Sequence, residues 1–284
     1  MILRPLRDSR DDAEAVIAVT AACSDDPPAD WPPVRAVRHL SRARHFARTD
    51  PGGCWLALDA SGQPVGAAVS SAREGTWGLP FLGVVPEARG SGVGTALLRR
   101  TLEYGRGCLR GIVVSPEHPA AVRAYRAAGF TLHPAMELSG TVDAARLAAV
   151  DGPVVEGGPK HRDLLDSVDR ARRGGAHGPD HEELLRHYRL VVADDLAGSG
   201  YCYLGEDRVE CLAATSRRIA TRLLTAALLS FEPGTRVGVA DLTAEQEWAV
   251  DVGLAAGLTV APHGFVCLRG MRPPMPWVPS QGFL

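Results

Sequence analysis

The chain has 284 residues, of which 45% are hydrophobic and 23% charged, a composition typical of a globular protein with one large domain or two ordinary ones. A formal net charge of -2 argues against a nucleic-acid-binding surface. The N-terminal segment lacks the apolar stretch of a signal peptide, and no run is long enough to span a membrane, so we expect a cytoplasmic protein. The six cysteines form no C-x-x-C pair, which favours reduced, mostly buried thiols over disulfides or a zinc site.

The first 140 residues predict a mixed sheet with helices packed on it. Aspartates ahead of the first helix and Gly129 after the last one mark helix ends, and four prolines make residues 24–33 a loop. The expected order is β-α-α-β-β-β-α-β-α-β. Strands are expected at 2–6, 54–60, 64–72, 79–85, 109–114 and 131–140, and helices at 13–23, 34–48, 95–106 and 119–130.

An internal repeat indicates a second domain of the same fold. The segment "YRAAGFTLHPAMELSG" at 125–140 resembles "GLAAGLTVAPHGFVCLRG" at 253–270, and "TALLRR" at 95 matches "TRLLTA" at 221. A strand at 152–158, a helix at 160–173 and a hairpin at 200–213 continue the same order. We therefore predict two tandem domains, 1–142 and 143–284.

The segment "PEARGSGVGTALLRR" at 86–100 joins a predicted strand to a predicted helix through three glycines. A strand, then glycines, then a helix N-terminus forms an anion site, because backbone N–H groups converge there and the helix dipole favours negative charge. The segment has no lysine, which excludes a P-loop. A Rossmann site needs G-x-G-x-x-G, whereas Gly90, Gly92 and Gly94 are spaced G-x-G-x-G; Glu117 is the acidic residue that would support this alternative.

The third ligand class is coenzyme A. Arg89, Gly90, Ser91, Gly92 and Gly94 match the Arg/Gln-x-x-Gly-x-Gly/Ala signature of the GNAT superfamily of acyl-CoA-dependent N-acyltransferases, which residues 1 to 140 resemble. A second family block, aromatic-x-x-x-Gly-Phe, is matched at residues 125–130. The fold class implied is α/β (α+β), with two GNAT-like domains, each a mixed, mostly antiparallel sheet flanked by helices.

The resemblance also implies the site. The residues expected to hold acetyl-CoA, as co-substrate, are Val84 and Val85 along the pantetheine arm and Arg89, Gly90, Ser91, Gly92, Val93, Gly94 and Thr95 around the pyrophosphate. Tyr125 stands at the position of the family's general acid, and its ordinary pKa near 10 keeps a tyrosine protonated at neutral pH. His118 replaces the family's usual asparagine and is expected to be a surface residue. We assign no general base, because Glu74, the candidate ahead of the motif strand, is expected to be a solvated turn residue.

The acceptor side is less determined by the sequence. Asp25, Asp26 and Asp30 could attract a cationic amine beside Trp31, although turn chemistry is the favoured explanation of these residues. The expected acceptor is a small-molecule or peptide amine, with no nucleic-acid or membrane partner, and dimers are common in the family. The alternatives are an acyl-CoA sensor without turnover and an NAD-dependent oxidoreductase.

In the second domain, residues 215–220 replace the glycine loop and Gly253 replaces the tyrosine, which predicts a degenerate copy without its own coenzyme site. His161, His177, His181 and His187 do not form H-E-x-x-H, so we expect surface histidines and no metal. The apolar, proline-rich tail from 271 to 284 is expected to dock on the protein.

Overall fold

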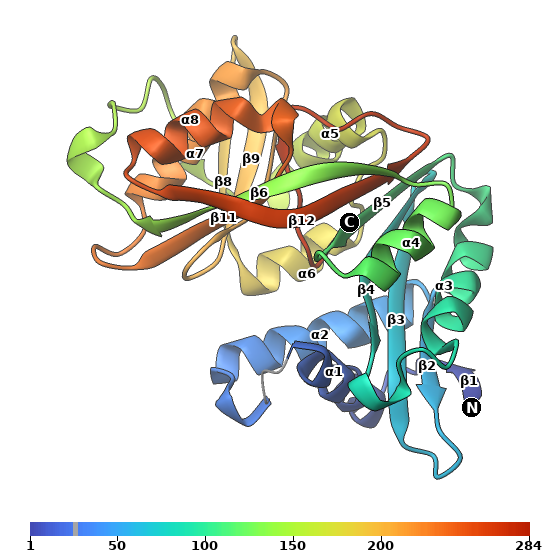
Figure 1. The fold of residues 1–284 in the computed structure, drawn as a ribbon. Coiled ribbons are helices and arrows are strands. Elements are labelled where there is room, and N and C mark those ends of the chain that lie inside the picture. Colours follow the sequence, from blue (N-terminus) through green and yellow to red (C-terminus); the bar gives the residue numbers. More distant parts are fainter. Residues whose placement is uncertain (25–27) are drawn as a thin grey trace. The chain divides into compact units, whose positions relative to one another are not determined.

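A computed structural model of the chain describes residues 1–24 and 28–284. The first repeat follows the predicted order of elements (Figure 1). Its elements are β1 (Ile2–Pro5), α1 (Arg10–Ser24), α2 (Pro33–Thr49), β2 (Cys54–Leu58), β3 (Pro64–Arg73), β4 (Thr76–Val84), α3 (Val93–Tyr104), β5 (Arg110–Ser115), α4 (Pro119–Ala127) and β6 (Thr131–Thr141). Gly129 adopts a φ of 86° just after α4, as expected for a helix-terminating glycine.

The second repeat has the same order. Its elements are β7 (Val155–Glu156), α5 (Arg162–Arg173), α6 (Asp180–His187), β8 (Arg189–Asp195), β9 (Gly198–Leu204), β10 (Val209–Ala214), α7 (Arg217–Leu229), β11 (Arg236–Leu242), α8 (Glu247–Ala255) and β12 (Thr259–Arg269), and the tail adds β13 (Trp277–Val278). The expected α/β (α+β) fold class is therefore confirmed, and the strand pairs β3–β4, β6–β12 and β9–β10 are antiparallel.

The chain divides into two compact units, one made of Met1–Leu109 with Leu284 and one of Arg110–Phe283. In the first unit, β1, β2, β3 and β4 form a sheet in that order, and α3 packs Val93 and Leu97 against Ala57 and Ala68 of the strands. In Figure 1, α1 and α2 lie to the left of these strands and α3 to the right. The small side chains of Ala57 on β2 and Ala68 on β3 thus leave room for α3, the helix that follows the glycine loop, to pack on the sheet.

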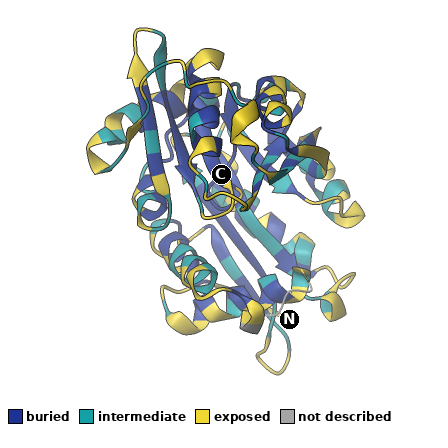
Figure 2. Cartoon of the chain, turned by 90° about the vertical axis from the view of Figure 1, so that its left-hand side faces the viewer, coloured by how far each residue is buried: buried dark blue, intermediate teal, exposed yellow. Residues whose placement is uncertain are grey.

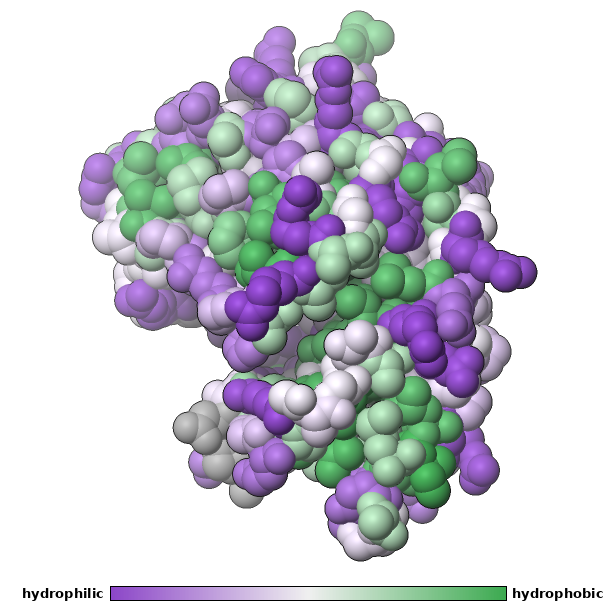
Figure 3. Space-filling view, turned by 45° about the vertical axis from the view of Figure 1, so that its right-hand side comes forward, coloured by the Kyte–Doolittle hydropathy of each residue, from purple (hydrophilic) through white to green (hydrophobic). Residues whose placement is uncertain are grey.

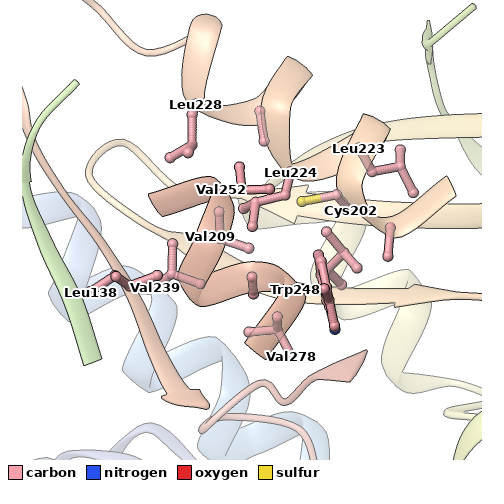
Figure 4. Packing of buried hydrophobic residues seen from close by; sticks show 14 of the residues in the cluster. Leu138, Cys202, Val209, Leu223, Leu224, Leu228, Val239, Trp248, Val252 and Val278 are labelled. Atoms are coloured by element: carbon pink, nitrogen blue, oxygen red, sulfur yellow. The ribbon is translucent and has the colours of Figure 1, made fainter. Parts of the chain in front are cut away.

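The second unit contains two sheets. One has the order β5-β12-β6-β11 and the other the order β13-β10-β9-β8-β7. One apolar cluster of this unit joins the strands β8, β9, β10 and β11 with the helices α7 and α8, around residues such as Leu223, Leu224 and Trp248 (Figure 4). Figure 2 shows that the strands are mostly buried, whereas the exposed residues lie on turns and outer helix faces.

The two repeats exchange strands within the second unit. β12, the last strand of the second repeat, lies between β5 and β6 of the first, so that Val266 is paired with Val114 on one side and His133 on the other. β6 in turn pairs with β11 of the second repeat. The two compact units consequently divide after Leu109. The sequence repeats instead predict a domain boundary between residues 142 and 143, and this boundary stays a prediction.

The C-terminal tail is buried, as its apolar composition predicts. Trp277, Val278, Phe283 and Leu284 are each 2% exposed or less. Leu284 packs in the first unit, where its backbone oxygen accepts a hydrogen bond from the Ser71 hydroxyl at 3.1 Å. A Cβ at Gly78 would lie 2.2 Å from that oxygen, so glycine is required where the chain end meets β4.

Both hydrophilic and hydrophobic residues reach the surface. Hydrophilic residues are spread over the face shown in Figure 3 and are interrupted by small hydrophobic areas. Among the helices of the described residues, none combines the length and hydrophobicity needed to cross a membrane. Of the six cysteines, Cys54, Cys202, Cys211 and Cys267 are buried, as expected for mostly buried thiols.

A buried ion pair ties the far end of α3 to the sheet. Asp50, which follows α2, accepts hydrogen bonds from Arg73 of β3 at 2.8 and 2.7 Å, and both side chains are nearly inaccessible. The Tyr104 hydroxyl at the end of α3 donates to the same carboxylate at 2.9 Å. The network therefore orients the helix whose other end forms the glycine loop.

We expect Asp50→Ala to lower the free energy of unfolding by about 3–5 kcal/mol, because it leaves the Arg73 guanidinium buried without its partner. Urea unfolding measures the loss. Glu103→Ala is the matched control, since it removes ion pairs on the exposed face of α3, and it should cost less than about 1 kcal/mol. Equal losses in the two variants would contradict this role for Asp50.

Candidate functional site

The glycine loop has the backbone geometry that its sequence predicts. β4 ends at Val84, a short 3-10 turn covers Pro86–Ala88, and α3 begins at Val93. Gly90 and Gly92 have φ values of 79° and 86°, in the left-handed region that residues with a side chain avoid. The two glycines therefore allow the chain to turn directly from the strand into the helix.

The loop leaves open space in front of the helix N-terminus. A Cβ built at Gly90 or Gly92 would meet no atom within 4 Å, and both residues are exposed. Gly92 is the N-cap of α3 and supplies no side-chain hydrogen bond. The first N–H groups of an α-helix have no partner within the helix, and they lie at the positive end of the helix dipole. This arrangement suits a phosphate or pyrophosphate group.

Side chains of the loop hold its shape. The Arg89 guanidinium donates through Nε to the Val84 carbonyl at 3.1 Å, and the Ser91 hydroxyl donates to the Ala88 carbonyl at 2.6 Å. Val93 is buried under the loop, whereas Thr95 on the first turn of α3 is exposed. The predicted loop residues 89–95 are thus brought together at one helix end.

The two valines expected along the pantetheine arm lie at the end of β4. The Val85 N–H donates to the Val65 carbonyl at 3.1 Å, and the Val84 carbonyl also accepts from the Cys23 thiol of α1 at 3.4 Å. Sequence reasoning missed Cys23, because only folding brings α1 beside this strand. Burial raises the pKa of the Cys23 thiol, which Arg89 partly offsets, so the thiol is a neutral group beside the loop.

Tyr125 lies on α4 in the second compact unit, whereas the glycine loop belongs to the first. Its side chain is 6% exposed, and its ring lies edge-on to Phe130 with centroids 6.2 Å apart. Its hydroxyl makes no hydrogen bond with any described residue. Burial raises the pKa of Tyr125 well above its usual value, which keeps the phenol protonated at neutral pH.

The other residues of the predicted acceptor side are dispersed. Asp30 is exposed, and Trp31 is buried against Ile17 and Ala21 of α1, so its indole is mainly a packing residue. Asp25 and Asp26 lie outside the described residues. Glu74 is exposed in the turn between β3 and β4, and His118 is exposed at the start of α4, as expected for both.

The corresponding loop of the second repeat is closed. The Ser216 hydroxyl caps α7 by accepting the Ile219 N–H at 3.3 Å, which occupies one of the free donors. Asp151 binds Arg218 at 2.7 Å and Arg222 at 2.8 Å, so a carboxylate of the chain itself pairs with the cations of this helix end. A Cβ at Gly253, which replaces the tyrosine, would lie 2.5 Å from Leu138, because α8 packs tightly on β6.

Comparison with known proteins agrees with this geometry. Residues 18–130 match the model of the Acetyltransferase (GNAT) family. They form a GNAT acetyltransferase domain. Such domains transfer an acyl group from coenzyme A to an acceptor, and the match spans both the glycine loop and Tyr125. No curated protein matches the sequence.

Solved structures with the same fold cover nearly the whole chain. A putative acetyltransferase from Pyrococcus horikoshii has a TM-score of 0.75 at 18% identity, covering 95% of this chain and 89% of its own. A GCN5-related N-acetyltransferase from Kribbella flavida has a TM-score of 0.59 at 20% identity, with 94% and 70% covered. A tandem GNAT protein from the clavulanic acid biosynthesis pathway has a TM-score of 0.58 at 14% identity, with 95% and 99% covered. The GNAT fold therefore extends over both repeats.

Two of the four histidines expected at the surface are buried, and that expectation was wrong. His177 and His181 have no exposed area, whereas His161 and His187 are partly exposed. The error arose because α5 brings Asp169 against both imidazoles, a contact between residues 8 and 12 positions apart. Burial by itself would raise the pKa of Asp169, but the two imidazoles hold it well below its usual range.

The GNAT fold of the second unit also holds a strained, buried carboxyl group at Asp241. This residue of β11 is 1% exposed and has a φ of 61°, which is unfavourable for a side-chain-bearing residue. Its Oδ2 accepts a hydrogen bond from Gln281 at 2.9 Å, and His263 Nε2 lies 3.8 Å from its Oδ1. Burial raises the pKa of Asp241 to about 6, against the opposing effects of Gln281 and His263.

The raised pKa gives a pH dependence with a defined sign. A carboxyl group whose pKa is higher in the folded state stabilises the fold at low pH and loses that contribution as the pH rises from about 4 through about 6. Asp241→Asn cannot ionise and tolerates a positive φ. We therefore expect the variant to be more stable than the wild type at pH 8 by roughly 3 kcal/mol, but not at pH 4.

Urea unfolding at both pH values measures the difference. Asp251→Asn on the exposed face of α8 is the control, and it should change stability equally at the two pH values. A wild type that remains as stable as Asp241→Asn at pH 8 would show that ionisation of Asp241 is not costly.

Proposed function

We propose that the GNAT domain binds acetyl-CoA at residues 89–95 and transfers the acetyl group to a primary amine. The observation that carries the proposal is the open helix N-terminus at Gly90 and Gly92, where left-handed glycines leave room for a diphosphate. Val84 and Val85 lead into this loop from β4, in the place where the pantetheine arm would run.

The reaction needs three events. The neutral amine nitrogen attacks the thioester carbonyl carbon, the resulting tetrahedral intermediate expels the coenzyme A thiolate, and a proton from the protein neutralises that sulfur. The amine also loses one proton, for which we assign no base. No step requires a metal ion or a redox cofactor.

Tyr125 is our candidate for the proton donor. Its buried phenol keeps its proton at neutral pH, and its hydroxyl makes no hydrogen bond to the described residues that would compete with a ligand. Transfer of that proton to a thiolate is general acid catalysis, and the transient phenolate could be reprotonated from the solvent.

We further propose that residues 143–284 are a degenerate copy without a coenzyme site. The Ser216 cap and the pairing of Asp151 with Arg218 and Arg222 support this, because they occupy the donors and cations that a diphosphate would use. The second copy then serves mainly to complete the exchanged sheet through β11 and β12.

The acceptor we propose is a small-molecule or peptide amine, and we infer no nucleic-acid or membrane partner. Six free thiols, four of them buried, fit a reducing compartment such as the cytoplasm. A homodimer remains an expectation from the family resemblance.

Binding at the loop predicts a ligand-dependent stability. Acetyl-CoA at 100 times its dissociation constant should stabilise the wild type by about 2.7 kcal/mol, whereas Gly92→Glu should gain nothing, because a carboxylate would fill the space for the diphosphate. Thermal unfolding with acetyl-CoA, and separately with NAD, measures this difference.

Gly62→Glu is the matched control. Gly62 also has a positive φ, at 84°, and open space around its Cβ, but it lies in the turn between β2 and β3. Both variants should lose similar stability from backbone strain, roughly 1–2 kcal/mol, and only Gly62→Glu should retain the response to acetyl-CoA. Stabilisation by NAD alone would instead favour a dinucleotide site and end the acyltransferase proposal.

The role of Tyr125 predicts a selective loss of kcat. Tyr125→Phe should reduce kcat by about 10²- to 10⁴-fold while leaving stabilisation by acetyl-CoA unchanged, because the ring remains in place and only the acid is lost. Release of free thiol with a panel of amines measures turnover. Tyr104→Phe, which removes a hydroxyl bound to Asp50, should lower stability without this effect on kcat. A wild type that binds acetyl-CoA but releases no thiol with any amine would indicate a sensor.

A further inference from the structure

Four potential metal ligands meet between α5 and α6 in the second unit. Asp166 and Asp169 are three residues apart on α5 and therefore lie on one face of the helix, His177 is in the connection, and His181 is in the first turn of α6. Asp169, His177 and His181 are completely buried, and the Asp166 side chain is 14% exposed. The sequence hides this set because its members are not arranged as a familiar motif.

Three of the ligand atoms lie close together. Asp169 Oδ2 lies 2.7 Å from His177 Nδ1 and 3.0 Å from His181 Nε2, and the ligand atoms of these three residues all lie within 4.8 Å of one another. Around a tetrahedral zinc ion with bonds near 2.0–2.1 Å, neighbouring ligand atoms are about 3.3 Å apart. Asp166 Oδ1 lies farther out, 3.7 Å from the His181 nitrogen, and its partly exposed side chain would have to rotate inward to complete the set.

Each ligand is also oriented by an outward partner. His177 Nε2 lies 3.2 Å from the Phe283 carbonyl, and His181 Nδ1 lies 3.1 Å from the Tyr203 hydroxyl. The Tyr201 hydroxyl donates to Asp169 Oδ1. Metal-bound histidines and carboxylates in proteins are held in this way, with the second atom of each group fixed by a hydrogen bond.

For Asp166, the outward partner is Arg162, whose Nε donates to Oδ2 at 2.9 Å. The inward oxygen, Oδ1, is buried and has no hydrogen-bond partner. An unpaired buried carboxylate oxygen is costly, and this one lies 3.7 Å from His181 Nε2.

His177 has a similar mismatch. The Asp169 carboxylate, 2.7 Å from Nδ1, and the Phe283 carbonyl, 3.2 Å from Nε2, can only accept hydrogen bonds. Burial lowers the pKa of His177 and favours the neutral imidazole, which has a single N–H for these two acceptors. A cation between Nδ1 and the carboxylate would leave that proton on Nε2 for the Phe283 carbonyl.

We propose that Asp166, Asp169, His177 and His181 bind a Zn²⁺ ion. Two carboxylate oxygens and two imidazole nitrogens are a tetrahedral donor set suited to zinc. Their two negative charges balance the two positive charges of the ion. Asp166 at the edge of the cluster provides the route from solvent.

With all four positions filled by the protein, the ion would be structural. It would fasten α5 to α6, and its outward partners would connect it to β9 through Tyr201 and Tyr203 and to the tail through Phe283. This site is independent of the acetyl-CoA proposal, because it lies wholly in the second repeat.

The test is metal analysis of the tag-free full chain purified without chelator. We expect about one zinc per chain, a lower unfolding temperature after removal by a chelator, and recovery with Zn²⁺ alone. Added to the metal-free protein, Co²⁺ should give the intense visible absorption of a tetrahedral N/O site at about one equivalent.

His177→Gln should abolish this absorption. Asp166→Asn, at the partly exposed edge where the fold tolerates change, should weaken Co²⁺ binding by more than about tenfold. His187→Gln on α6 is the control that removes a histidine outside the cluster and should leave binding intact. Two results would overturn the proposal. One is a wild type that contains no stoichiometric zinc and is stabilised by neither Zn²⁺ nor Co²⁺. The other is a Co²⁺ spectrum that is unchanged in His177→Gln and Asp166→Asn.

Discussion

The insertion of β12 between β5 and β6 is the constraint on which the arrangement of the chain depends. β6 also pairs with β11. The last two strands of the first repeat, β5 and β6, therefore share a sheet with the last two strands of the second repeat, β11 and β12. Backbone hydrogen bonds in such a sheet cannot be satisfied by one repeat alone. The strands of the second repeat are therefore needed to complete this sheet.

The two repeats show how a strand-to-helix turn becomes a binding site or an ordinary structural turn. In the first, Gly90 and Gly92 leave the N–H groups of α3 open to solvent. In the second, Ser216 caps α7 and Asp151 pairs with the nearby arginines. The helix N-terminus is therefore open to an external anion in the first repeat, whereas in the second repeat its donor and the nearby cations are paired within the protein.

Buried polar groups divide into those that are satisfied and those that are not. Asp50 accepts bonds from Arg73, Tyr104 and the Ala72 N–H, and it fixes α3 on its sheet. Asp166 and Asp241 each retain a buried carboxylate oxygen without a partner. Such a carboxylate oxygen lowers stability unless it binds a proton or a metal ion. We therefore connect Asp241 with the pH dependence of stability and Asp166 with zinc binding.

The sequence by itself determined the order of elements, the turn from β4 into α3 and the buried state of the tail, because each follows from local patterns: apolar periodicity, glycines at positive φ and a run of apolar residues. It also predicted a coenzyme site at the glycine loop, whose residues are contiguous. Only the tertiary structure decided the strand exchange, the position of Cys23 beside Val84, and the burial of His177 and His181 against Asp169. These depend on contacts between distant segments, where strand pairing and helix packing, rather than neighbouring residues, set which side chains meet.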